Sequence, residues 1–272
     1  MSSTHQQADH PIRPVEAHRV ATGARLHFGL FSPGRAAGRS FGGAGMMVDS
    51  PGTAITARPA EEFSVRGQEA SGIAALADRI AQHFSRPLPL VELAVESRAP
   101  RHAGLGSGTQ LAMCVAKQLV NAWRTSCDNH TLALAACRGK RSAIGIHGFE
   151  QGGFLIDAGK KDNDQIAPLI DRIEFPANWR IVLIDVSDNA DGVIPSAKQR
   201  QPSFVGVSGA DEAEAFDRLP PASLERTETL RREATEVLAP AVRAKNFEDF
   251  SQSVTRFNRM AGECFAPVQG GT

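Results

Sequence analysis

The sequence lacks the features that would direct the chain to a nucleic acid or a membrane. Its 30 Lys and Arg residues balance 30 Asp and Glu residues, so no long-range field of one sign favours either surface. No apolar run approaches the roughly 20 residues that span a bilayer, and the first residues contain no signal-peptide hydrophobic core. With 42% hydrophobic and 22% charged residues, the 272-residue chain has an ordinary globular composition. We therefore expect an ordinary soluble, cytoplasmic protein.

The four cysteines lack the spacing of a redox or metal motif. Cys114, Cys127, Cys137 and Cys264 form no Cys-x-x-Cys pair. Cys114 and Cys137 fall inside segments with helical spacing, which favours buried thiols in a reducing compartment over a disulfide or a metal site. No internal repeat or low-complexity segment is present either.

Hydrophobic periodicity predicts mixed helices and strands behind a disordered polar tail over residues 1–18. Apolar alternation or near-continuous apolar runs predict strands over 20–31, 53–57, 91–95, 154–157 and 179–186, the last buried on both faces. Helical spacing predicts helices over 73–84, 107–122, 132–137 and 247–261, and two or three helices are expected after residue 210, where 224–238 is heavily charged. Ser50-Pro51-Gly52 predicts a turn. A boundary at Phe175-Pro176 would separate an N-terminal domain, 19–175, from a C-terminal one, 176–272.

The most informative stretch joins the strand near Val95 to the helix after Ser107. It contains three glycines, at 104, 106 and 108, and Ser107 with Gln110 has the spacing of a capping box. A glycine-rich turn that leads into a helix offers free backbone N–H groups and the positive end of the helix dipole. The turn therefore suits a phosphate or pyrophosphate, with Arg101 and His102 at its mouth. A tight turn that only connects two elements is the structural alternative.

The spacing of these glycines excludes two common nucleotide motifs. Gly-x-Gly-x-x-Gly is not met, and the Gly-Lys-Ser/Thr ending of a P-loop is missing. The stretch instead resembles the second signature of the GHMP superfamily of small-molecule kinases, Pro-x-x-x-Gly-Leu-Gly-Ser-Ser-Ala. Pro100 and the run Gly104–Ser107 fit this signature, whereas Gly108-Thr109 replaces its Ser-Ala.

Four segments in family order resemble one branch of this superfamily, the β-ribofuranosylaminobenzene 5′-phosphate synthases. They are 24–30 with 38–45, 101–111, 145–157 and 206–216. The resemblance implies an α+β, GHMP kinase-like fold, with an N-terminal domain like domain 2 of ribosomal protein S5 and a ferredoxin-like C-terminal domain. A third glycine-rich signature is expected near the C-terminus of the family, and none is found before Thr272. We therefore expect an incomplete C-terminal domain and uncertain activity for this chain.

The branch implies a decarboxylating phosphoribosyl transfer in tetrahydromethanopterin biosynthesis. A ring carbon of 4-aminobenzoate or 4-hydroxybenzoate would attack C1 of phosphoribosyl pyrophosphate, with loss of carbon dioxide and pyrophosphate. GHMP kinases that resemble mevalonate kinase carry an aspartate seven residues before a Gly-Gly pair, and that position is Gly145 here. A kinase would lack its carboxylate base. An ATP-dependent small-molecule kinase and a non-catalytic binding paralogue remain as alternatives.

The implied chemistry assigns roles to specific residues. His27 and His147, and His102 as a third candidate, would orient the carboxylate or amino group, although each histidine could instead make a loop or cap hydrogen bond. The residues expected at the pyrophosphate are Arg101, Gly104, Gly106, Ser107, Gly108, Thr109 and Gln110. The candidates for the 5′-phosphate are Arg25, Arg39 and Arg141. The candidates for the aryl wall are Phe28, Phe41 and Phe149.

Metal and partner expectations are weaker. Asp211 and Glu212 could hold a metal–pyrophosphate, with Mg²⁺ as the possible ion and no organic cofactor expected. Asp157 and Glu150 are expected to be structural. The chain is a possible homodimer.

Overall fold

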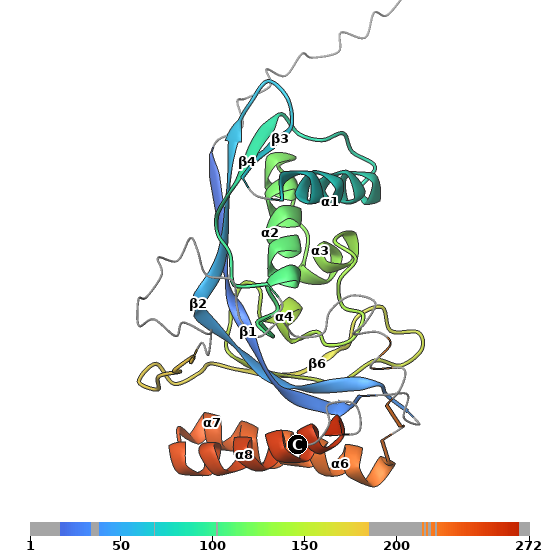
Figure 1. The fold of residues 1–272 in the computed structure, drawn as a ribbon, viewed down its shortest axis with the longest axis vertical. Helices are drawn as coiled ribbons and strands as arrows, with labels where there is room; N and C mark the ends of the chain where they lie inside the picture. Colours follow the sequence, from blue (N-terminus) through green and yellow to red (C-terminus); the bar gives the residue numbers. More distant parts are fainter. Residues whose placement is uncertain are drawn as a thin grey trace, which may run out of the picture.

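The computed structural model describes residues 17–33, 38–67, 69–101, 103–184, 214, 216, 219–220 and 222–266. These residues form one mixed sheet with helices packed on it (Figure 1). The strands are β1 His18–Ser32, β2 Phe41–Pro59, β3 Ser64–Arg66, β4 Val91–Ser97, β5 Phe154–Asp157 and β6 Leu169–Ile173. Their order is β3-β4-β2-β5-β6, and β1 pairs with β2. All pairings are antiparallel except that of β3 with β4.

The long β1–β2 ribbon is the frame on which both layers of helices pack. Strand β1 confirms the prediction over 20–31, but the predicted turn at Ser50-Pro51-Gly52 is wrong. Strand β2 continues through these residues as a bulge, because the register passes from Thr22 opposite Thr53 to Ala24 opposite Val48. The peptide bond between Ser50 and Pro51 is cis.

The first core lies between one end of this ribbon and the helices α1 Ala70–His83, α2 Ser107–Ala122, α3 Asn129–Ala135 and α4 Ile144–His147 (Figure 1). Helix α1 buries its predicted face at Ile73, Leu76, Ala77 and Ile80. Helix α2 is buried nearly all round, since it contacts the sheet on one side and α1 and α3 on another. The loop ahead of α2 is thereby fixed at the edge of a rigid core.

A second core lies under the other end of the ribbon. It is covered by α6 Leu224–Arg232, the π-helical turn η1 Glu233–Leu238, α7 Ala239–Ala244 and α8 Phe247–Glu263 (Figure 1). Phe250 and Phe257 of α8 pack there, as their helical spacing predicts, whereas Phe247 of the same stripe is 59% exposed. The predicted boundary at Phe175-Pro176 stays a prediction. The helices that follow it, α6 to α8, pack directly on strands β1 and β6 of the sheet.

The predicted strand over 179–186 is wrong for the part described. Residues 179–184 have no strand structure, and Val182 and Ile184 are 80% and 81% exposed. Among the described residues the sheet ends instead at β6. The sequence did not indicate this strand, and its Leu169 and Ile170 are also exposed. An apolar run is thus not sufficient for a buried strand when the described elements offer no neighbour to pair with it.

The start of α2 differs from its predicted cap, and α3 begins at a side-chain cap. The cap of α2 is Gly106, in the left-handed region with φ 67°, so the predicted Ser107–Gln110 capping box is wrong and Ser107 is already helical. Asp128 caps α3, and its carboxylate accepts a hydrogen bond from the Thr131 N–H. Cys137 is exposed just after α3 rather than buried inside it, while Cys114 is buried in α2 as expected.

No helix among the described residues is long and apolar enough to cross a membrane. The predicted tail lies outside the described residues up to residue 16, and β1 begins at His18.

Candidate functional site

The glycine turn between β4 and α2 has the geometry of an anion-binding loop. Gly104 and Gly106 have φ angles of 74° and 67°, which only glycine adopts without strain. A Cβ at Gly104 or Gly108 would meet no heavy atom within 4 Å, so the backbone there is open to a ligand. The N–H groups of Ser107 and Gly108 precede the first intrahelical bond and point out of the positive end of α2, whereas the Thr109 N–H donates to the Gly106 carbonyl at 3.0 Å.

Arg25 of β1 clips this turn to the sheet. Its backbone N–H donates to the Leu105 carbonyl at 2.9 Å, and its Nη2 donates to the Gly104 carbonyl at 3.4 Å. Gly106 lies against the same side chain, since an added Cβ would be 3.1 Å from the Arg25 Cβ. The turn is therefore held in its open conformation by the strand beneath it.

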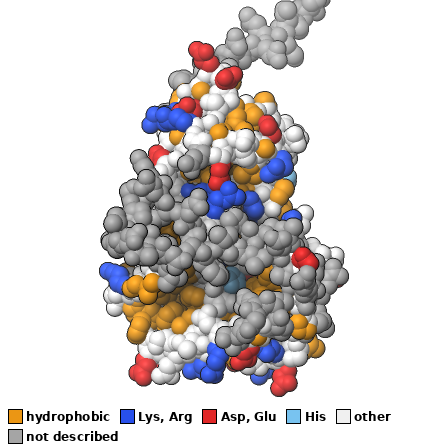
Figure 2. Space-filling view, in the orientation of Figure 1, with side chains coloured by type: hydrophobic (Ala, Val, Ile, Leu, Met, Phe, Trp, Pro, Cys, Tyr) orange, Lys and Arg blue, Asp and Glu red, His pale blue; other side chains and the backbone are white. Residues whose placement is uncertain are grey.

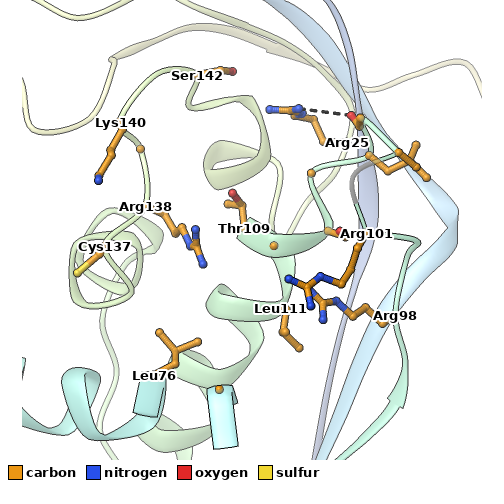
Figure 3. Close-up of a pocket in the computed structure, with 18 of the residues that line it drawn as sticks. Arg25, Leu76, Arg98, Arg101, Thr109, Leu111, Cys137, Arg138, Lys140 and Ser142 are labelled. Atoms are coloured by element: carbon orange, nitrogen blue, oxygen red, sulfur yellow. Dashed lines mark hydrogen bonds between the residues drawn. The ribbon is translucent and has the colours of Figure 1, made fainter. Parts of the chain in front are cut away.

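A cavity of about 800 Å³ opens beside the turn (Figure 3). Of its lining residues in the described part of the chain, seven are basic and one, Glu69, is acidic. The basic residues are Arg25, Arg79, Arg98, Arg101, Arg138, Lys140 and Arg141. Figure 2 shows Lys and Arg side chains gathered near the middle of the face that Figure 1 presents. Such an excess of cationic side chains favours an occupant with several negative charges.

Glu69 neutralises only part of this charge. Its carboxylate accepts hydrogen bonds from Arg98 and from Arg101, the latter at 2.8 Å. Burial opposes ionisation of Glu69, but the two arginines prevail and lower its pKa. Glu69 therefore orients two guanidinium groups at the rim of the cavity while both stay within reach of a ligand.

The predicted pyrophosphate residues are mostly brought together here. Ser107 and Thr109 line the cavity with Arg101 and the three glycines, and Thr109 projects towards its centre in Figure 3. Gln110 does not line it: the side chain is fully buried, its Nε2 donates to the Gly145 carbonyl at 2.8 Å, and its Oε1 accepts from Thr22 at 3.1 Å. His102 lies outside the described residues.

The candidates for the 5′-phosphate divide. Arg25 and Arg141 line the cavity, and the Arg141 guanidinium also lies 4.4 Å from the centre of the Phe216 ring. Arg39 is absent from the lining: its Nη1 donates to the Gly159 carbonyl and to the Asp164 carboxylate, each at 2.8 Å. Arg39 thus fixes the loop after β5.

The three predicted aryl-wall residues are not part of this lining. Phe28 packs with Phe154 and Phe250 in and around the second core, and Phe149 is buried in the first. Phe41 faces Phe216, with ring centroids 6.1 Å apart. An aryl group bound in the cavity would meet mainly Leu76, Leu111 and Ile73 as apolar neighbours among the described residues.

The two predicted histidines lie away from the cavity. His27 of β1 is half-buried, its ring lies beside Gly43 of β2, and its buried Nε2 has no hydrogen-bond partner. Burial, and then the charge of Arg25, lower its pKa to about 3, so its ring is neutral at neutral pH. His147, at the end of α4, places Nε2 2.9 Å from the Ala167 carbonyl, as a structural histidine would.

Gly145, where a kinase of this superfamily would carry aspartate, has no room for a side chain. An added Cβ would lie 2.6 Å from the Gln110 Nε2 and 3.8 Å from the Arg25 side chain. The buried Gln110 amide thus occupies the space that a carboxylate would need. The packing agrees with the absence of a carboxylate base that the sequence indicates.

Asp157 is structural, as predicted. Its buried carboxylate accepts hydrogen bonds from the N–H groups of Ala143 and Gly159 and from the Ser142 hydroxyl. Burial raises its pKa, and these donors act against that shift. Asp157 therefore anchors the segment that carries Lys140, Arg141 and Ser142 along one wall of the cavity.

No group of three potential metal ligands is found among the residues that the structure describes. Glu212 and Asp211, the predicted metal candidates, lie outside them. Glu69 is the only carboxylate in the described lining and is already held by two arginines. The described residues therefore do not fit a resident Mg²⁺ ion.

The sequence did not single out Arg79, Arg98 or Arg138 as site residues. The signal for Arg98 was its place two residues before Pro100, and that for Arg138 was the basic run to Arg141. Arg79 gave no signal, because an exposed arginine on an amphipathic helix is ordinary. Only the packing of α1 beside the glycine turn places it at the cavity.

Comparison with known sequences gives consistent relatives. The model of the family described as "GHMP kinases N terminal domain" matches residues 72–154, which include the glycine turn. The chain is 29% identical to beta-ribofuranosylphenol 5′-phosphate synthase of Methanocaldococcus jannaschii, over 87% of this chain and 75% of that protein. It is 27% identical to the protein of the same name from Methanothermobacter thermautotrophicus, over 92% and 79%.

Solved structures share the fold at low identity. The phosphomevalonate kinase of Streptococcus pneumoniae superposes with a TM-score of 0.55 at 14% identity, over 92% of this chain and 80% of that one. The mevalonate kinase of Methanococcus jannaschii gives 0.54 at 13%, with the same coverage. The chain therefore has the fold of these GHMP kinases, and its sequence is similar to those of the beta-ribofuranosylphenol 5′-phosphate synthases.

Proposed function

We propose that the chain catalyses a decarboxylating phosphoribosyl transfer from phosphoribosyl pyrophosphate to 4-hydroxybenzoate or 4-aminobenzoate. The observation that carries the proposal is the cationic cavity beside an open glycine turn, with seven basic residues against one acidic residue in its described lining. Phosphoribosyl pyrophosphate bears phosphate at both ends of a ribose, so it suits a cavity with this charge. The two relatives with a synthase name support the same reaction.

The leaving group is the part that most needs the protein. As the bond from C1 of ribose to the pyrophosphate oxygen breaks, negative charge develops on that oxygen. The N–H groups at the start of α2, the hydroxyls of Ser107 and Thr109, and Arg101 are suited to stabilise it. Fixed donors of this kind act without reorganisation during the reaction, which is why they lower the barrier efficiently.

The aryl partner supplies the electron pair. The ring carbon that bears the carboxylate attacks C1 of ribose and forms the new carbon–carbon bond. The carboxyl group then leaves as carbon dioxide, and the electrons of its bond to the ring restore aromaticity. The sequence of steps needs orientation of the two reactants more than proton transfer. The phenol in the relatives' name favours 4-hydroxybenzoate of the two acceptors.

A kinase is the second candidate because the solved neighbours named above are kinases. The absent side chain at Gly145 opposes it, since the buried Gln110 amide fills the position of a catalytic carboxylate. Gly108 also offers no hydroxyl to a metal–nucleotide. We propose that any Mg²⁺ would enter with the diphosphate as its counter-ion, since the only carboxylate of the described lining, Glu69, is held by two arginines.

Labelled substrate separates the candidates. The full chain is incubated with phosphoribosyl pyrophosphate and carboxyl-labelled 4-hydroxybenzoate or 4-aminobenzoate, and carbon dioxide and pyrophosphate are measured. We expect both products in equal amounts. Formation of ADP from ATP in place of carbon dioxide would identify a kinase, and neither reaction would indicate a binding protein.

The paired variant Ser107→Ala, Thr109→Ala tests the pyrophosphate assignment. Loss of two donors to a charged leaving group is expected to lower kcat/KM for phosphoribosyl pyrophosphate by about 100-fold or more. The matched control is Ser251→Ala on the outer surface of α8, where the hydroxyl donates only to a carbonyl of its own helix. Full activity in the paired variant would contradict the assignment.

A further inference from the structure

Arg138 is a cation that the described protein leaves without a counter-ion. Its Nε is buried and has no hydrogen-bond partner, and no described carboxylate forms an ion pair with it. The side chain points into the cavity from the side opposite Arg98 and Arg101 (Figure 3). A buried N–H donor of a charged group without an acceptor is costly, so its presence at a cavity wall indicates an anionic occupant.

The surroundings of Arg138 increase that cost. Burial first, and then the charges of Arg79 and Arg98, lower its pKa. Arg79 is on α1 and Arg98 lies in the segment after β4, so three different elements bring positive charge to the cavity. Within the described lining, Glu69 is the only opposing charge, and it binds Arg98 and Arg101 rather than Arg138.

The backbone of Arg138 is fixed by the end of α3. Its N–H donates to the Ala133 carbonyl at 2.8 Å, and the N–H of Cys137 donates to the Leu134 carbonyl at 2.9 Å, which is the Schellman pattern. Gly139 follows with φ 91° and packs on Ile166 and Ile146. Arg138 is thus held at a defined position before any ligand binds, as a preorganised binding residue should be.

We infer that Arg138, with Arg79, forms a second anion subsite that binds the 5′-phosphate of the ribosyl donor across the cavity from the diphosphate turn. The inference rests on the proposed function for the identity of the ligand. It replaces Arg39, which is engaged by Gly159 and Asp164, as the candidate for this phosphate. The two phosphate groups of the donor would then be held from opposite walls, with the ribose between them.

Two probes separate the two ends of the cavity. Binding of ribose 5-phosphate and of inorganic pyrophosphate to the full chain is measured by calorimetry. Arg138→Met is expected to weaken ribose 5-phosphate binding by about 10- to 100-fold, the loss of a charged hydrogen bond, and to leave pyrophosphate affinity within about 3-fold. The paired variant Ser107→Ala, Thr109→Ala is expected to give the reverse pattern.

Three further variants guard the interpretation. Arg138→Lys keeps the charge and should recover part of the affinity for ribose 5-phosphate. Arg79→Met, an exposed substitution on α1, should weaken the same ligand even if Arg138→Met fails to fold. Arg66→Met removes an arginine that pairs with Glu92 and is not part of the described cavity lining, and should change neither affinity.

The inference is overturned if Arg138→Met and Arg79→Met bind ribose 5-phosphate as the parent does, or if Arg138→Met weakens pyrophosphate equally, which would indicate a single diphosphate site. This outcome is independent of the reaction. Carbon dioxide release with no effect of these variants on ribose 5-phosphate would remove the subsite and keep the synthase. The expected binding pattern without carbon dioxide release would keep the subsite and remove the synthase.

Discussion

Two glycine-rich segments of this chain look alike in sequence and differ in what surrounds them. In β2, a Cβ at Gly43 would lie 2.3 Å from the Gly29 carbonyl oxygen, and one at Gly45 would lie 2.5 Å from that of Leu26. In the turn before α2, Gly104 and Gly108 have nothing within 4 Å. The first set lets two strands pack closely, and the second leaves a backbone open to a ligand. Glycine density alone therefore does not identify a binding site; the space beside each glycine does.

The largest loss of stability is expected at the glycines of β2, where an added Cβ would meet backbone atoms. Gly43→Ala would push a methyl group into the backbone of β1, which cannot move without breaking the ribbon, and should lower the free energy of unfolding by roughly 3 kcal/mol or more. Chemical denaturation measures this. The matched control, Gly262→Ala in α8, has open space and should be stabilised by up to about 1 kcal/mol. Equal stability of both variants would remove the distinction drawn above.

Gly145 sharpens the comparison, because it is closed by a side chain rather than by backbone. Gly145→Ala is expected to cost about 2 kcal/mol, since the Gln110 amide must leave a position where it bonds both Gly145 and Thr22. With Gln110→Ala already present, the same change should cost clearly less, and a double-mutant cycle of unfolding free energies measures that coupling. Additive effects would show that Gln110 does not fill the space.

His27, which lies beside Gly43, tests how far the β1–β2 region excludes water. Its pKa is lowered from 6.5 to about 3, so on acidification the unfolded chain binds a proton that the folded chain does not. Stability should therefore fall as the pH drops below 6.5, by about 2 kcal/mol between pH 7 and pH 5. The raised pKa of Asp157 acts in the opposite direction, and it does so equally in the parent protein and in a His27→Gln variant. His27→Gln should lose less stability over this interval; parallel curves would show that His27 titrates normally.

The same contrast explains what the sequence could and could not predict. Helices α1 and α2 and strands β1, β4 and β5 follow from periodicity, because each buries one face or all of itself in a core. The predicted side-chain cap of α2 is wrong because Gly106, in the left-handed conformation, caps the helix instead. The spacing of apolar residues does not indicate such a cap. The predicted strand is wrong at 179–184 because burial of an apolar run depends on a neighbouring strand as well as on composition.

The site was predictable only where it is local. The turn from Gly104 to Thr109 is continuous in sequence, so its residues lie together in the cavity as expected. Arg138 and Arg79 reach the cavity from α3 and α1, and only tertiary packing brings them there. Phe28 and His27, which the implied chemistry assigned to the site, do not line the cavity, and β1 has a register shift between His27 and Gly29.

Gly108→Ala is expected to give the smallest change in stability and the clearest separation of the two kinds of glycine. Gly108 is helical and its Cβ would point into open space, so alanine should keep or raise the free energy of unfolding, by at most about 1 kcal/mol. The same methyl group would occupy part of the surface that we assign to pyrophosphate, whose affinity should fall by roughly 10-fold. Gly262→Ala, with the same gain in helix propensity and no cavity beside it, should leave that affinity unchanged. If Gly108→Ala bound pyrophosphate as tightly as the parent, the open space beside Gly108 would not be where the diphosphate lies, however cationic the cavity around it.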